Sequence, residues 1–321
     1  MVALIALLQS LLLAVSGPPT SPEYLALRVA DAEGHFAREG LAVSIRTTRS
    51  EVGAAEALAQ GQAQLAATSL EALLRFGYRD PQNLPRLVFG LTAAPPVALL
   101  VPDSLAATVT SVRQLAGLRI GITGPGAPEQ VWLNAVLRQA GLEVTDVEIV
   151  SLGRRPLAGA LEAGQVQAAV VPEPQASRLL ADGAAALLVD LRTPESAARA
   201  VGGPTVNAAV FARGREAVHP RVLAAFARAV LAAERRIGQA RVDALAGALP
   251  DSVVGAPAEF EHRIETARRL YLPGGSVTPE QLERTVTMIR AAAPLPASPR
   301  WPGADRMLAI PALTRRPTPT R

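Results

Sequence analysis

Short apolar runs alternate along the chain with segments that have helical periodicity. Apolar residues recur at helical spacing over 25–36, whereas over 41–46 they alternate with small or polar residues, which is the period of a strand. The same succession continues to about residue 212. Strands that alternate with helices of about ten residues indicate parallel βαβ units, so the expected fold class is α/β.

Turn and capping residues set the boundaries of these elements. Ser21 followed by Pro22 predicts the start of a helix that Gly40 ends, and Thr68-Ser-Leu-Glu71 is a capping box. The expected strands are 11–16, 41–45, 65–67, 87–91, 97–101, 118–123, 147–152, 166–171, 186–191 and 205–212. The longer helices expected after the first lie at 129–139, 220–239, 257–271 and 279–293.

A repeat with an offset of about a hundred residues runs through this pattern. The matching stretches are LLLAVSGPPTSPE (11–23) with LRIGITGPGAPE (118–129), REGLAV (38–43) with RQAGLEV (138–144), and ALAQGQAQLAA (57–67) with ALEAGQVQAAV (160–170). Three matches in the same order indicate two copies of one β-α-β-α-β unit. The apolar start resembles the core of a signal peptide but has no basic segment and no clear cleavage site. We therefore interpret 11–16 as the first strand and 1–10 as the remnant of a leader.

The two copies predict two lobes of mostly parallel sheet flanked by helices. Lobe one is expected to comprise 11–98 and 208–293, and lobe two 99–207. The strand 97–101 leads out of lobe one and 205–212 leads back. Two such crossovers restrict the lobes to a hinge motion. From residue 294 to 321 the Pro and Arg content rises, which predicts an extended or disordered tail.

Composition narrows the chemistry. The 321 residues include no cysteine and only three histidines, and all 32 basic residues are arginine. Thiolate and Schiff-base catalysis, disulfides, and Cys-ligated or HExxH-type zinc sites are therefore excluded. The formal charge of +4 is spread without arginine–aromatic clusters, so no nucleic acid partner is expected. No cofactor and no metal are expected either.

Several segments resemble a known family. They are AEGHFAREGLAVSI (32–45), AEALAQGQAQLAATSLEALL (55–74), VRQLAGLRIGITGPG (112–126) and ALEAGQVQAAVVPEP (160–174). Together they resemble the NMT1/THI5-like and sulfonate-binding solute proteins. The resemblance implies a type II periplasmic-binding-protein fold, a periplasmic location, and a monomer that delivers a small solute to an ABC permease and its ATPase. The family usually has Asp where this chain has Gln64 and Gln167, and we interpret that position as structural.

A ligand site is expected where helices begin at the carboxyl ends of the strands, because N–H groups there are unpaired and positively polarised. The repeat places two of these turns opposite each other, and two more follow the third strand of each lobe. The residues expected to bind ligand are Gly17, Pro18, Thr20, Ser21, Arg49, Thr68, Ser69, Gly124, Gly126, Ala127, Glu173 and Asn207. For each Ser and Thr, simple helix capping is the competing explanation.

The chemistry of the ligand stays open at this stage. Helix N-termini with Arg49 suit a sulfonate or carboxylate, whereas Glu51 or Glu173 suits an amine or an aminopyrimidine. Tyr24 is the aromatic residue nearest an expected cleft turn, and a core role on its helix face is the alternative. Only 3% of the residues are aromatic, so an aromatic ligand would find few stacking partners. We expect a small polar or anionic solute.

Two other classes of function compete with solute binding. An enzyme on the same scaffold, of a pyrimidine- or menaquinone-pathway kind, would be favoured by paired carboxylates in the cleft, and the lack of Cys, Lys and clustered His opposes it. A ligand-sensing domain of a regulator is the third hypothesis.

Overall fold

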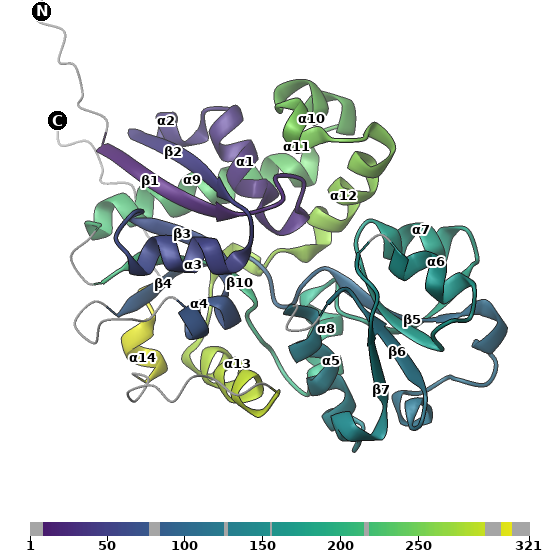
Figure 1. Ribbon diagram of the computed structural model, residues 1–321. Coiled ribbons are helices and arrows are strands. Elements are labelled where there is room, and N and C mark those ends of the chain that lie inside the picture. The colour runs from purple at the N-terminus through teal and green to yellow at the C-terminus, as the bar shows by residue number, and fades with distance from the viewer. Residues whose placement is uncertain are drawn as a thin grey trace, which may run out of the picture.

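Two α/β lobes lie side by side and are joined by two crossovers of the chain (Figure 1). The computed structural model describes residues 9–76, 84–124, 128–154, 156–214, 218–292 and 303–309. Each lobe is built on a five-stranded sheet with helices packed on both faces. This is the type II periplasmic-binding-protein architecture that the sequence predicts.

The two sheets have equivalent strand orders, β2-β1-β3-β10-β4 in lobe one and β7-β6-β8-β5-β9 in lobe two. The strands of lobe one are β1 (Gln9–Ser16), β2 (Leu41–Thr48), β3 (Leu65–Ser69), β4 (Pro85–Gly90) and β10 (Ala208–Arg213). Those of lobe two are β5 (Val97–Pro102), β6 (Arg119–Ile122), β7 (Glu148–Ser151), β8 (Ala168–Pro172) and β9 (Ala185–Asp190). The strands β1, β2 and β3 thus correspond to β6, β7 and β8, as the sequence repeat predicts.

Four of the five strands in each sheet run in the same direction, as the predicted mostly parallel sheets require, and one strand runs against them. In lobe one β10 runs antiparallel to β3 and β4, and in lobe two β5 runs antiparallel to β8 and β9. The direction follows from the path of the chain. Each of these strands enters its lobe from the crossover, at the carboxyl ends of the parallel strands, so it must run against them.

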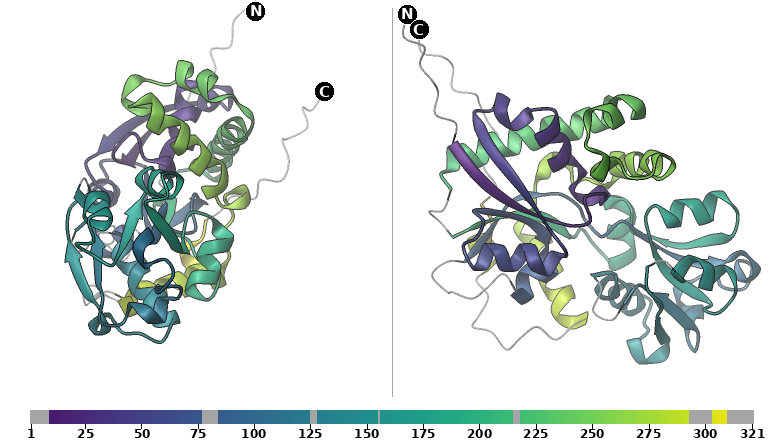
Figure 2. Two further views of the ribbon diagram at one scale, coloured as in Figure 1. Left: turned by 90° about the vertical axis from the view of Figure 1, so that its right-hand side faces the viewer. Right: turned by 45° about the horizontal axis from the view of Figure 1, so that its top comes forward.

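Helices cover both faces of each sheet (Figure 2). Lobe one has α1 (Leu25–Ala32), α2 (His35–Arg38), α3 (Glu51–Ala59), α4 (Leu70–Phe76), α9 (Pro220–Gln239), α10 (Val242–Ala248), α11 (Asp251–Val254) and α12 (Pro257–Leu270). Lobe two has α5 (Pro128–Gln139), α6 (Pro156–Glu162), α7 (Gln175–Ala181) and α8 (Pro194–Val201). The single helix expected from Pro22 to Gly40 is broken at Gly34, whose φ of 70° is left-handed.

The core of lobe one follows the alternation of the strands. In β1, Leu11 and Leu13 face α1 and α9, where Phe36 stacks on Phe226 with ring centroids 5.2 Å apart. Ala14 faces the other way, toward α3. Lobe two repeats this plan, with α6 and α7 on one face of its sheet and α5 and α8 on the other. Burial on both faces is what near-continuous apolar strands require.

The two crossovers lie against each other between the lobes. Thr205 Oγ1 donates to the Ala93 carbonyl over 2.9 Å, and the backbone N–H of Asn207 donates to the Thr92 carbonyl over 2.7 Å. A further helix, α13 (Pro279–Ala292), packs on this region, because Gln281 donates to the Thr205 carbonyl. The same helix reaches α5, where the Asn134 amide donates to Ala292. It therefore contacts both the crossovers and lobe two.

The ends of the described chain differ from the expectation. Residues 9 and 10, assigned above to a leader remnant, belong to β1 and pair with β2. Residues 303–309, assigned to an extended or disordered tail, form the short helix α14 (Ala304–Met307), and Ala309 donates to the Leu87 carbonyl of β4. Since β4 is an edge strand of its sheet, this contact pairs a backbone carbonyl that would otherwise be exposed. Residues 1–8, and 294–321 apart from 303–309, lie outside the described residues.

None of the described helices is both long enough and apolar enough to cross a bilayer.

Candidate functional site

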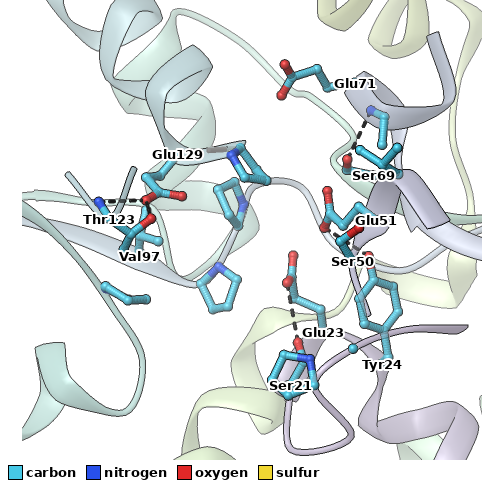
Figure 3. A pocket seen from close by; sticks show the side chains of 18 of the residues that line it. Ser21, Glu23, Tyr24, Ser50, Glu51, Ser69, Glu71, Val97, Thr123 and Glu129 are labelled. Atoms are coloured by element: carbon cyan, nitrogen blue, oxygen red, sulfur yellow. Dashed lines mark hydrogen bonds between the residues drawn. The ribbon is translucent and has the colours of Figure 1, made fainter. Parts of the chain in front are cut away.

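A cleft of about 380 Å³ lies between the two lobes. Its walls are the segments that follow β1, β2 and β3 in lobe one and β6 and β8 in lobe two, and the crossover residues 95–97 also line it (Figure 3). These are carboxyl ends of parallel strands, where open α/β sheets bind ligands. The cleft thus lies where the sequence predicts a ligand site.

Half of the residues expected to bind ligand line this cleft: Gly17, Pro18, Ser21, Arg49, Ser69 and Glu173. Thr20 lines a neighbouring hollow at α12. Gly124 is described but does not line the cleft. Gly126 and Ala127 lie outside the described residues.

The remaining two, Thr68 and Asn207, are buried behind the cleft and hold residues that line it. Thr68 Oγ1 donates to the carbonyl of Glu51 over 2.8 Å, and Asn207 Nδ2 donates to Glu23 Oε1 over 2.9 Å. The sequence pattern selects both because they lie at strand ends, Thr68 in the last part of β3 and Asn207 just before β10. What they do locally is to position glutamates.

The main chemical feature of the cleft is a set of four carboxylates that the sequence analysis largely missed. Glu23, Glu51, Glu71 and Glu129 all line it (Figure 3). Each lies in the first turn of its helix or 3-10 turn. The repeat gives a signal for two of them, because its first matched stretches both end in Pro-Glu, and the glutamates of these pairs are Glu23 and Glu129.

Glu23 and Glu51 are held by neighbouring side chains of lobe one. Besides Asn207, Ser21 donates from its hydroxyl to Glu23 Oε2 over 3.4 Å. Tyr24, which is buried, donates from its hydroxyl to Glu51 Oε1 over 3.2 Å. Tyr24 therefore serves both the core and the cleft, the two roles that its sequence position left open.

The other two carboxylates have different partners. Glu129 Oε1 of lobe two accepts hydrogen bonds from the backbone amide of Thr123, over 3.1 Å, and from its hydroxyl. Glu71 forms an ion pair with Arg75 one turn later in α4, with Nε and Oε1 3.0 Å apart. Glu23 and Glu129 are only 8% and 7% exposed, so these carboxylates are set into the wall and not spread over its rim.

Burial and the charges of neighbouring carboxylates raise the pKa of Glu23, Glu51 and Glu71. Burial raises the pKa of Glu23 well above its ordinary value, and the nearby Glu51 charge raises it further. The pKa of Glu51 is also raised, first by burial. Burial raises the pKa of Glu71 to about 7, although Arg75 opposes the shift. Ionisation of these three carboxyl groups together is therefore unfavourable unless a positive charge lies nearby.

Glu173, the charged residue expected at the cleft edge, is already neutralised. Its Oε1 lies 3.0 Å from Arg192 Nη1, and its two oxygens also accept from Ser177. Arg192 in turn pairs with Asp190. The carboxylate therefore ties β8 to the segment after β9, and its side chain is not free to pair with a ligand.

The arginines of the cleft lie at its margin or are paired. Arg75 pairs with Glu71, and Arg49 and Arg154 are exposed. Arg154 Nη2 donates to the backbone carbonyl of Glu173 over 3.1 Å. Within the described ranges no three His, Asp or Glu side chains are arranged to hold one metal ion.

Comparison with known proteins places this geometry in a family. The model of the family described as NMT1/THI5 like matches residues 21–233. The chain belongs to the NMT1/THI5-like family. The match covers β2 to β10 and most of the cleft wall, so this NMT1/THI5-like protein carries its candidate site within the region that defines the family. Comparison with curated proteins gives no match.

Several solved structures are similar to this NMT1/THI5-like chain. A protein of Bordetella bronchiseptica RB50 is 26% identical, with a TM-score of 0.65 and 88% of each chain covered. The alkanesulfonate-binding protein SsuA of Xanthomonas axonopodis pv. citri, bound to MOPS, is 18% identical, with a TM-score of 0.64 and 94% of this chain and 98% of that chain covered. The desulfurization enzyme DSZB is 19% identical, with a TM-score of 0.60 and 93% and 96% covered. The same fold thus serves both a binding protein and an enzyme.

Proposed function

We propose that this protein is the solute-binding component of an ABC uptake system and takes a small molecule into the cleft between its lobes. The observation that supports this most strongly is the construction of the cleft. Residues that follow the first strand of each repeated unit, β1 in lobe one and β6 in lobe two, line one cleft, and crossover residues 95–97 line it as well. Membership of the NMT1/THI5-like family and similarity to a sulfonate-binding protein agree with a binding role.

Binding would work through closure of the lobes. A solute that contacts both walls binds the closed form more tightly than the open form, and this difference shifts the population toward closure. The paired crossovers supply the hinge, because their mutual hydrogen bonds at Ala93 and Thr205 hold them together while their ends turn. Solute release to a permease then requires reopening.

The partners and the location follow from this role. We propose a monomer in the periplasm that delivers solute to an ABC permease and its ATPase, with no resident cofactor and no nucleic acid partner. Similarity to the periplasmic sulfonate-binding proteins supports the location.

Two measurements on the full chain test the proposal. A ligand that binds only the folded protein raises its thermal unfolding midpoint in proportion to RT ln(1 + [L]/Kd). Small-angle scattering with and without that ligand should then show a smaller radius of gyration. Stabilisation without any change in shape would contradict hinge closure, and failure of every solute class to stabilise the protein would contradict solute binding.

One observation favours a second function, catalysis on the same scaffold. A carboxyl group with a pKa of about 7, as at Glu71, suits general acid–base chemistry near neutral pH, and DSZB shows that the fold supports an enzyme. The decisive test is a turnover assay on any ligand that binds. Recovery of the unchanged ligand after prolonged incubation would exclude this alternative for that ligand, whereas conversion that is lost in Glu71→Gln would establish it.

A further inference from the structure

We propose that the cleft binds a small organic cation, a protonated amine or an amidinium, through carboxylates from both lobes. This inference rests on the proposed solute-binding function and adds the class of ligand. It departs from the sequence-based expectation of a polar or anionic solute.

The first support is the placement of the carboxylates. Glu23, Glu51 and Glu71 come from lobe one and Glu129 from lobe two, and all four line the same cleft (Figure 3). The four groups interact electrostatically. The charge on Glu51 raises the pKa of Glu23 and Glu71, and the charge on Glu129 raises the pKa of Glu51 and Glu71. A cation among them would relieve this repulsion.

The second support is an unused acceptor in the cleft wall. Glu51 Oε1 accepts from Tyr24, but Glu51 Oε2 is buried and finds no hydrogen-bond partner among the described residues. Buried carboxylate oxygens are normally paired, and an unpaired one is unfavourable. Because Glu51 lines the cleft, an N–H group of a bound cation would supply the missing donor.

The third support is that the described turns of the cleft, which do not include residues 125–127, hold no built anion site. The helix N-termini that open onto the cleft already carry the protein's own glutamates in their first turns. The cations do not offset this, because Arg75 is paired with Glu71, and Arg49 and Arg154 are exposed at the margin. An anion would meet carboxylates in the interior of the cleft.

The size of the cation follows from the spacing of the carboxylates. No three of them in the described part of the chain could converge on one metal ion. A molecule several atoms long, with N–H groups at more than one position, can reach Glu51 on one wall and Glu129 on the other. Such a ligand contacts both lobes, so it also favours closure.

Matched probes of similar size and different charge test the ligand class on the full chain. The cations are putrescine, agmatine and benzamidinium, and the comparison compounds are butanesulfonate and butanol. At least one cation should raise the unfolding midpoint and bind in calorimetry, whereas butanesulfonate and butanol should not. Binding should release protons, because Glu23, Glu51 and Glu71 ionise beside a cation. Calorimetry in buffers of different ionisation enthalpy measures the sign of this proton exchange.

Variants locate the binding in the cleft. Glu51→Gln and Glu71→Gln should each weaken binding of the cation at least about tenfold, because each removes a buried charge partner. Glu261→Gln on the exposed face of α12 makes the same charge change away from the cleft and should bind like the parent. Circular dichroism and the unliganded midpoint show whether each variant is folded, and either cleft variant alone suffices.

Each outcome decides between the ligand class and the wider function. Binding of butanesulfonate with closure, and of no cation, overturns the cation proposal and leaves solute binding intact. Binding of no probe of either charge overturns the cation proposal, and a broader solute screen without a hit overturns solute binding. Cation binding with proton uptake, or with affinity unchanged in both cleft variants, overturns the site.

Discussion

The turn after β1 holds Gly17 against the end of β2. A Cβ at this position would lie 2.5 Å from the carbonyl oxygen of Thr48, which is backbone and has little room to move. Gly124 occupies the equivalent position in the second repeat, and a Cβ there would meet nothing within 4 Å. Two glycines that the sequence aligns are therefore under different constraints, and only the first is needed for close approach.

We predict that Gly17→Ala distorts this turn and weakens binding in the cleft. The methyl group must displace the turn that carries Ser21 and Glu23, at a cost on the order of 1–3 kcal/mol in the free energy of unfolding. Gly124→Ala is the matched control and should change stability by less than about 0.5 kcal/mol. Urea unfolding of both variants measures the difference, and equal effects would contradict the argument.

Glu234 is a second residue whose environment has a measurable consequence. It lies on α9, where burial raises its pKa to about 8, and burial together with the Glu234 charge raises the pKa of Tyr271. Its Oε1 has no hydrogen-bond partner in the described part of the chain. The folded protein therefore keeps a proton here that the unfolded chain releases above about pH 4.5.

The expected result is a stability that falls as the pH rises from about 4.5 to about 8, because the unfolded state binds fewer protons in this window. Glu234→Gln removes the ionisable group, so near pH 8 it should be more stable than the parent by on the order of 1–3 kcal/mol. Near pH 5 the two should be similar. Denaturant midpoints at both pH values test this, with Glu261→Gln as the exposed control. A stability difference between Glu234→Gln and the parent that is the same at both pH values would refute it.

At the scale of elements, the two lobes use one device to join the first and third strands of each repeat. The side-chain Oε1 of Gln64 accepts from the backbone N–H of Leu12 over 2.8 Å. The backbone N–H of Gln64 donates to the Leu12 carbonyl over 3.1 Å. Gln167 makes the same two contacts with Arg119, over 3.1 and 2.9 Å. The glutamines that stand where the family usually has Asp are structural in both copies.

Removing this device should have equal and independent effects in the two lobes. Gln64→Ala and Gln167→Ala should each lower the free energy of unfolding by about 0.5–1.5 kcal/mol, the usual net value of a hydrogen bond. The double variant should show the sum within about 0.5 kcal/mol, because the sites are in separate sheets. Gln165→Ala, with an exposed side chain, is the control. A double variant no worse than either single one would contradict independence.

The elements themselves were predictable because their signals are local. Alternation, capping residues and the repeat locate the ten strands described here and their order within each unit. Local signals do not show where β10 and β5 insert, because their directions depend on the path of the crossovers. They also do not show that Glu23 and Glu129 turn into the cleft, since a glutamate in a first helical turn is ordinarily solvated. Asn207 lies on the return crossover and its partner Glu23 lies far away in the sequence, so no local signal shows that the two residues meet.

At the scale of the whole molecule, one apolar cluster runs through both lobes. It includes Ala14 and Leu73 of lobe one, Ile120 and Trp132 of lobe two, and Leu282 of α13. Two further clusters are confined to single lobes. A shared core of this kind couples the unfolding of the lobes, while the cleft stays on the side where the strands end.

We predict that the unliganded protein unfolds in one calorimetric transition. Leu282→Ala, at a fully buried position of the shared cluster, should lower the free energy of unfolding by about 2–4 kcal/mol and separate the transition into two. Leu179→Ala, in a cluster of lobe two alone, should destabilise the protein without such separation. Differential scanning calorimetry distinguishes them. Two transitions in the parent protein would show that the lobes are independent.

The position of β10 also affects how the protein is made. On a ribosome, β1 to β4 emerge before the strand that belongs between β3 and β4, whereas all five strands of the other sheet are available once β9 has appeared. A nascent chain at that stage exposes two unpaired strand edges in the half that was synthesised first, and such edges attract other chains. The half that is translated first is therefore the last to be completed, and a chaperone that guards this chain should be needed until β10 has been released.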